Sequence, residues 1–196
     1  MGRFKKFPLV LFWLLTLNLI ACSNIETIEN TSPDLISSEA TVSFDDENPD
    51  IKTVRGPTIS VRESFGKFTT ALLLGGGAGF GSAVHLEGTR DNAGLWTLQA
   101  IASIQYTNLG GVYRRYDKAG IEGSPPLVLT TVDMEKQFTI NSINMTETVS
   151  VTLPESLLKE KSSEGFTLIV ADDSGNSEQL TVPASYVSGF LLALEK

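Results

Sequence analysis

The sequence predicts a mainly β domain of the α+β class, a small antiparallel sheet or sandwich with short helices, one of them at the C-terminus. Apolar and polar residues alternate along 95–106, which is typical of a strand with one buried face. Two further runs, Phe166–Ala171 and Ser177–Val182, flank an Asp-Asp-Ser-Gly-Asn turn and predict a hairpin. Four apolar residues near the C-terminus then repeat at helical spacing: Val187, Phe190, Leu191 and Leu194.

The other elements follow from shorter patterns. Strands are predicted at 82–87, 127–134 and 143–153, and a short helix at 113–119. A strand, a proline and a helix follow one another twice, around Pro154 and Pro183, because proline suits the first turn of a helix. The strand at 95–106 has a predicted core face made of every second residue: Trp96, Leu98, Ala100, Ala102, Ile104 and Tyr106.

The N-terminus has the layout of an export signal. A basic stretch, 1–6, precedes an apolar run, 7–21, that falls short of the about 20 residues needed to span a membrane. The run ends at Ala21, a small residue, and Cys22 follows as the single cysteine of the chain. The pattern predicts a secretory signal peptide over 1–21, cleaved between Ala21 and Cys22.

Leu19-Ile20-Ala21-Cys22 resembles the lipobox of bacterial lipoproteins. The resemblance implies a diacylglycerol on the sulfur of Cys22 and a stable membrane anchor, since each buried CH₂ contributes about 0.8 kcal/mol. In that class Ser23 at the next position implies an outer-membrane location, and we expect the domain to face the periplasm.

The last fifty residues or so loosely resemble uncharacterised proteobacterial envelope lipoproteins. The shared pattern is a strand, Leu-Pro, a short helix, a hairpin, Val-Pro and a Tyr-Val-x-Gly-Phe-Leu helix. This resemblance implies a cell-envelope protein and no particular activity.

Charge divides the chain into three parts. Residues 23–51 hold eight acidic residues and no basic one, which predicts a disordered tether over 22–52 and a single β-rich domain over 53–196. The whole chain has 15 basic and 23 acidic residues, and this acidic balance argues against a nucleic-acid partner. Asp45, Asp46 and Glu47 form either a solvated acidic run, the favoured interpretation, or a calcium or partner site.

No catalytic residue, metal site or cofactor is predicted. The glycine-rich run 75–81 lacks dinucleotide-binding spacing, because Phe80 stands where a third glycine is needed. His85, the only histidine, and Ser82 should point to opposite faces of a strand. The turn at Asp172 has calcium-loop spacing, but Ser177 replaces the required glycine.

One segment combines aromatic and cationic side chains, as glycan- and peptide-binding surfaces do: Tyr113, Arg114, Arg115 and Tyr116. The alternative is an amphipathic helix with solvated arginines. The leading functional hypothesis is a non-catalytic envelope lipoprotein that binds another envelope protein or supports assembly. Two alternatives are a small-ligand carrier with an apolar cavity and a periplasmic hydrolase that uses carboxylates such as Glu87, Asp91 or Asp133.

Overall fold

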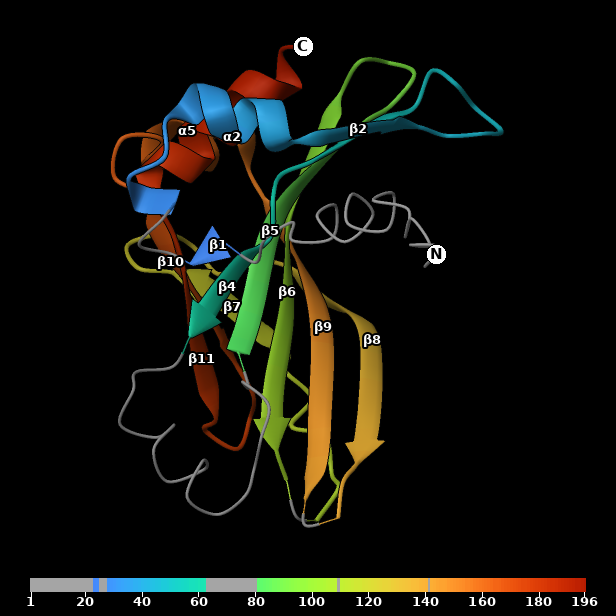
Figure 1. Ribbon diagram of the computed structural model, residues 1–196, viewed down its shortest axis with the longest axis vertical. Coiled ribbons are helices and arrows are strands. Elements are labelled where there is room, and N and C mark those ends of the chain that lie inside the picture. The colour runs from blue at the N-terminus through green and yellow to red at the C-terminus, as the bar shows by residue number, and fades with distance from the viewer. Residues whose placement is uncertain (1–22, 25–27, 63–80, 109, 141) are drawn as a thin grey trace, which may run out of the picture.

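Four long strands of one sheet run along the molecule in the computed structural model, which describes residues 23–24, 28–62, 81–108, 110–140 and 142–196 (Figure 1). The sheet has the strand order β1-β4-β5-β6-β9-β8, with β3 also paired to β5 and β2 paired to β3. All of these pairs are antiparallel except β1 with β4. The strands are β1 (Ser23–Asn24), β2 (Thr41–Phe44), β3 (Lys52–Arg55), β4 (Ile59–Arg62), β5 (Gly81–Arg90), β6 (Trp96–Thr107), β8 (Leu129–Phe138) and β9 (Ile143–Leu153).

A second, three-stranded sheet lies against the inner face of the first and makes the fold a sandwich with helices at one end (Figure 1). Its order is β11-β10-β7, where β7 is Lys118–Ile121, β10 is Phe166–Ala171 and β11 is Ser177–Val182. The predicted hairpin of β10 and β11 is confirmed, and so are the strands predicted at 82–87, 95–106, 127–134 and 143–153. The predicted mainly β, α+β class is therefore correct.

The core lies between the two sheets. Strand β6 turns its predicted core face inward, with Trp96 partly buried and the other five residues buried. Buried and partly exposed residues also alternate along β5 and most of β9. Their buried residues, such as Leu86, Val149 and Val151, lie in the core beside those of β6. The alternation of the sequence therefore marks the covered face of the three central strands.

The C-terminal helix is α5 (Ala184–Leu194), which follows Pro183 as predicted. Val187 and Phe190 are fully buried, whereas Leu191 and Leu194 are partly buried and pack against the core. The shorter α4 (Glu155–Lys161) follows Pro154 in the same way. Both proline positions are therefore confirmed as helix starts.

The predicted disordered tether is wrong for residues 33–44. Helix α2 (Pro33–Glu39) begins with its Ser32 side chain accepting from the backbone N–H of Leu35 at 3.4 Å, and it buries Ile36 completely. After α2, strand β2 pairs with β3 over four residues. The average composition of the segment hides these local signals, so the folded domain begins upstream of residue 53.

Helix α2 packs on α5 at a glycine. A Cβ atom on Gly189 would lie 2.6 Å from the Cβ of Ile36 and 2.7 Å from the backbone oxygen of Pro33. The missing side chain lets the two helices approach closely, which outweighs the poor helix propensity of glycine.

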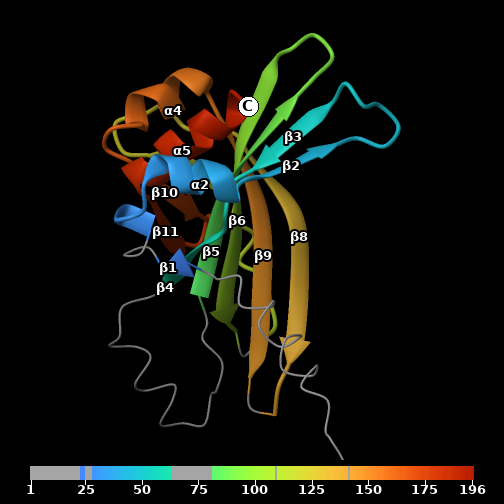
Figure 2. The ribbon, with the colours of Figure 1, turned by 45° about the horizontal axis from the view of Figure 1, so that its top comes forward.

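Two hairpin ends, β2–β3 and β5–β6, project past the helices as a pair of arms (Figure 2). Phe44 and Leu95 are exposed there, and the Asp45 side chain accepts from the N–H groups of Glu47 and Asn48. The acidic run therefore helps to form a turn. The predicted signal peptide with Ala21, the predicted lipidation site Cys22 and the glycine-rich run up to Phe80 lie outside the described residues.

Candidate functional site: the free edge of β8 and the segment docked beside it

The predicted helix at 113–119 is wrong. Residues 111–117 form an irregular segment that leads into β7, and Arg115 has a positive φ of 60°, which no α-helix allows. The four residues of the predicted binding surface also differ in burial and do not form one surface. Tyr116 is 1% exposed and belongs to the core, Tyr113 and Arg114 are partly buried, and Arg115 is exposed.

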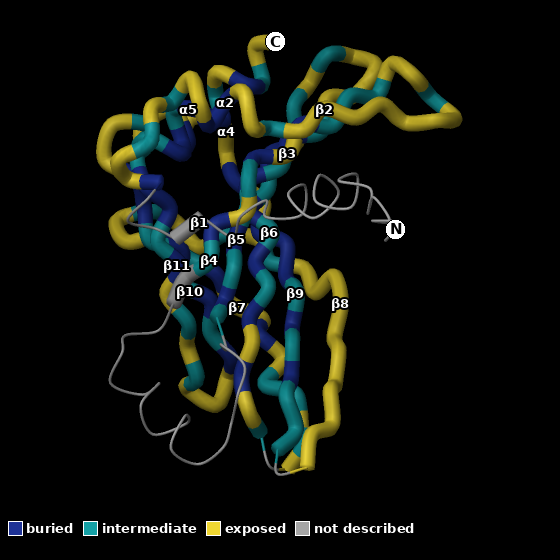
Figure 3. The backbone as a smooth tube through the Cα atoms, viewed as in Figure 1, coloured by how far each residue is buried: buried dark blue, intermediate teal, exposed yellow. Residues whose placement is uncertain are grey.

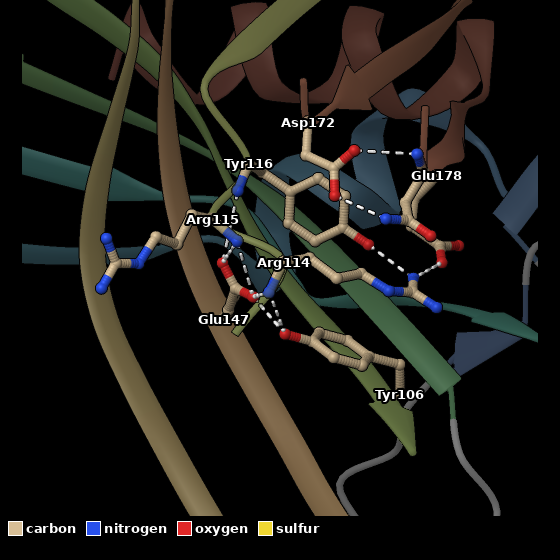
Figure 4. A network of polar contacts seen from close by, with 8 residues as sticks. Tyr106, Arg114, Arg115, Tyr116, Glu147, Asp172 and Glu178 are labelled. Carbon is tan, nitrogen blue, oxygen red and sulfur yellow. Dashed lines mark hydrogen bonds and ion pairs between the residues drawn. The ribbon is translucent and has the colours of Figure 1, made fainter. Parts of the chain in front are cut away.

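A buried carboxylate explains this conformation. Glu147 on β9 is 0% exposed, and its oxygens accept from the backbone N–H groups of Arg114 at 2.8 Å, Arg115 at 3.0 Å and Tyr116 at 3.3 Å (Figure 4). The Tyr106 hydroxyl donates to the same carboxylate. Three successive N–H groups converge on this one buried carboxylate, and the positive φ of Arg115 lets them do so, so the carboxylate stabilises the irregular form of the segment.

Arg114 uses its charge inside the molecule. Its guanidinium lies 4.2 Å from the ring centre of Tyr106, donates to the Tyr116 hydroxyl at 2.8 Å and pairs with Glu178 at 3.1 Å (Figure 4). Burial raises the pKa of Tyr116 to about 12, against the opposing effect of Arg114. Burial and the bond to Glu147 also raise the pKa of Tyr106 well above its usual range, so both phenols stay protonated. This part of the predicted surface is structural.

Arg115 differs from its neighbours. Figure 4 shows its side chain directed away from Glu147, Tyr106 and Tyr116. No ion pair of its guanidinium occurs within the described ranges. Its backbone is bonded to Glu147, and the residue opposite Glu147 on the next strand is Met134 of β8. Arg115 therefore places a solvated cation on the inner face, one strand away from the sheet edge.

A lysine joins the docked segment to β8. The Lys136 ammonium lies 4.7 Å from the ring centre of Tyr113 and donates to the backbone oxygen of Gly111. Both contacts cross from the edge strand to the segment that Glu147 holds. Tyr113 and Lys136 thus form a cation–π pair at β8, and Arg115 belongs to the same segment as Tyr113.

Strand β8 itself is bare. Among the described strands it pairs with β9 alone, and nine of its ten residues are exposed (Figure 3). The exposed apolar residues on and around it are Val128, Val132, Met134, Phe138 and Ile140. A register shift between Thr131 and Asp133 places a bulge at Val132. A long edge with exposed apolar side chains is a template for pairing with another chain.

The carboxylates considered for hydrolysis lie apart. Glu87 on β5 pairs with Arg55 at 2.8 Å, and Asp91 caps the turn between β5 and β6 by accepting from Ala93 and Leu95. Asp133 lies on β8, with β6 and β9 between it and β5. Among the described residues, no cluster of three or more His, Cys, Asp or Glu side chains could hold a metal ion.

Two further predictions are confirmed: Ser82 and His85 point to opposite faces of a strand, and Asp172 belongs to a turn. Ser82 is buried on the inner face of β5, and His85 lies on the opposite face, partly buried, with Nε2 4.0 Å from Glu87. Burial, reinforced by the charge of Arg55, lowers the pKa of His85 from its ordinary value. Asp172 accepts from the N–H groups of Ser174 and Asn176 and so closes the β10–β11 turn.

Two surface hollows of about 380 and 400 Å³ adjoin β10 around Phe166. Glu29 and Glu164 line the first, and Glu122 and Lys161 line the second. Such charged linings do not match the apolar cavity that a carrier of small apolar ligands needs.

Sequence reasoning missed the role of Glu147 and the edge position of β8, although it predicted the strand itself. A signal for Glu147 was present, since it stands at an inward position of the alternation in β9, between Met145 and Val149. The edge position of β8 carried no comparable signal, because it depends on the strand order of the whole sheet.

Comparison with known proteins gives no relative: no protein-family model, no curated protein and no solved structure matches this chain. Within the part of the chain that the structure describes, no helix is both long and apolar enough to cross a membrane.

Proposed function

We propose that this chain is a lipoprotein of the bacterial envelope, anchored in the outer membrane through Cys22, whose domain binds another envelope protein. The observation that carries the binding role is the edge of β8 that no described strand covers, where Met134 and Phe138, with Ile140 just beyond the strand, are exposed to solvent. Monomeric proteins usually shorten or cover such edges, because an unpaired row of backbone groups recruits foreign strands. The lipobox resemblance and the export signal support the location.

Site-specific photocrosslinking tests the binding role. A photoreactive amino acid at Phe138, in the full chain expressed in its host envelope, should give a discrete crosslinked species. The matched control is Leu192 on α5, another exposed apolar residue far from β8 along the fold. Equal crosslinking from both positions, or none from Phe138, would refute a binding role for the edge.

Fractionation tests the anchor separately. Cys22→Ser removes the acceptor sulfur, so the variant should accumulate uncleaved or be recovered in soluble form. A cleaved Cys22→Ser protein that still sediments with membranes after a salt wash would contradict lipid anchoring. The β8 result is independent of this outcome.

A further inference from the structure

The two faces of β8 carry opposite charge. Asp133 and Glu135 lie opposite Thr148 and Thr146 of β9, which are on the outer face of the sheet. Met134 and Lys136 lie opposite Glu147 and Met145, which are buried on the inner face. Successive residues of a strand alternate between faces, so the edge offers carboxylates on one side and an ammonium on the other.

The inner side is reinforced by a second cation. Arg115 lies over Glu147, and Glu147 is the cross-strand neighbour of Met134. Its guanidinium is exposed, and the described residues offer it no ion pair. The chain has a net charge of -8, but the inner side of the β8 edge carries the two cationic side chains Arg115 and Lys136.

The edge of β8 faces away from β9, and one of its backbone N–H groups already has an acceptor within the strand. The N–H of Met134 is satisfied by the carboxylate of its own neighbour Asp133, at 2.8 Å, and it therefore points away from β9. Alternate residues of an antiparallel strand turn their N–H groups the same way, so Lys136 and Phe138 also face the edge. The charge of Asp133 and the bulge at Val132 are features that disfavour unselective pairing of an edge strand with other chains.

Resting on the proposed function, we propose that β8 accepts an antiparallel strand of a partner protein whose charges alternate in the complementary sense. Its side chains opposite Met134 and Phe138 are apolar, and the one opposite Lys136 is acidic. Its side chains opposite Asp133 and Glu135 are basic. Oppositely charged cross-strand neighbours stabilise a pair, whereas like charges oppose it.

A pair of isomeric peptides tests this pattern. Read antiparallel to β8 from Phe138 to Asp133, the matching sequence is Ile-Thr-Glu-Lys-Ile-Lys, and the control is Ile-Thr-Lys-Glu-Ile-Lys. Both have the same composition and net charge, and they differ in which face carries the acid. With identical flanking residues and the full chain in detergent micelles, fluorescence anisotropy should give a Kd about tenfold lower for the matching peptide.

A charge exchange in the protein provides the reciprocal test. The double variant Glu135→Lys with Lys136→Glu should reverse the peptide preference, and its urea midpoint checks that it remains folded. Equal binding of the two peptides, or an unchanged preference in the folded variant, would overturn the proposal.

The outcomes separate this proposal from the proposed function. Crosslinking at Phe138 without discrimination between the peptides would refute the charge pattern and leave the binding role standing. A crosslinked species with the mass of two copies of this chain, together with concentration-dependent sedimentation, would make the occupant a second copy and would also overturn the proposal.

Discussion

The central strands and the edge strand of the large sheet share a length and a ladder but differ in cover. Strands β5, β6 and β9 bury alternate residues beneath the small sheet and α5, while β8 exposes both of its faces. The docked segment 111–117 reaches only as far as Glu147 and Lys136. The second sheet covers the central strands and leaves β8 uncovered, so the strands that carry the core differ from the strand that we propose for partner binding.

Two phenylalanines test this division most directly. Phe190 is fully buried and Phe138 is 74% exposed. Phe190→Ala should lower the free energy of unfolding by about 3–5 kcal/mol, because it removes buried surface and leaves a cavity. Phe138→Ala should change it by less than about 0.5 kcal/mol. Urea denaturation measures both, and similar midpoints for the two variants would break the comparison.

Two glutamates on paired strands give the next largest contrast. Glu147→Ala leaves the N–H groups of Arg115 and Tyr116 and the Tyr106 hydroxyl without their acceptor, while the N–H of Arg114 keeps only the Tyr106 oxygen, and the change should cost about 3 kcal/mol. Glu135→Ala, on the bare strand, should be nearly neutral. Glu147→Gln keeps one carbonyl acceptor and should fall between them. A neutral Glu147→Ala would show that the docked segment does not depend on the carboxylate.

A smaller effect is expected where α2 meets α5. Gly189→Ala should destabilise the domain by about 1–3 kcal/mol, because the new methyl group overlaps Ile36 and Pro33. In an open helix the same change is stabilising by about 1 kcal/mol, so the sign is decisive. Gly120→Ala on strand β7, where a Cβ would have no neighbour within 4 Å, controls for an added methyl group that meets no clash. Thermal denaturation distinguishes the two signs.

The smallest effect concerns pH on the outer face of β5. Burial lowers the pKa of His85 below 6.5 in the folded protein, so the unfolded chain binds the proton more readily. Stability should fall as the pH drops below 6.5 toward the lowered pKa, with a slope of at most about 1.4 kcal/mol per pH unit from this group. His85→Gln should flatten that part of the profile. Identical slopes for both proteins between pH 7 and about 5.5 would contradict this account.

Strong periodicity is what made parts of this fold predictable. The alternation in β6, the hairpin of β10 and β11, and the helical stripe of α5 are local patterns, and the structure confirms all three. Helix α2 was missed because an acidic average concealed Ile36, whose burial requires Gly189 on the far side of the sequence. Such a long-range contact has no local signal.

The candidate site was harder to predict for the same reason. The segment at 113–119 has helix-forming residues, yet Glu147, some thirty residues further along, recruits its N–H groups. Sequence reasoning did single out Arg115 and Tyr113, which lie beside β8. It also included Tyr116, which is in the core.

The contact of α2 with α5 also constrains the order of assembly. Residues 33–39 pack on residues 184–194, so this contact forms only after both segments are present. Lys196 adds to it by donating to the backbone oxygen of Ser37 at 3.2 Å. Contacts between distant parts of a chain slow folding, since a long loop must close first. In a chain that folds from its N-terminus, α2 would therefore stay unpacked until α5 is present. Removal of α5 should accordingly leave Ile36 of α2 without its packing partner.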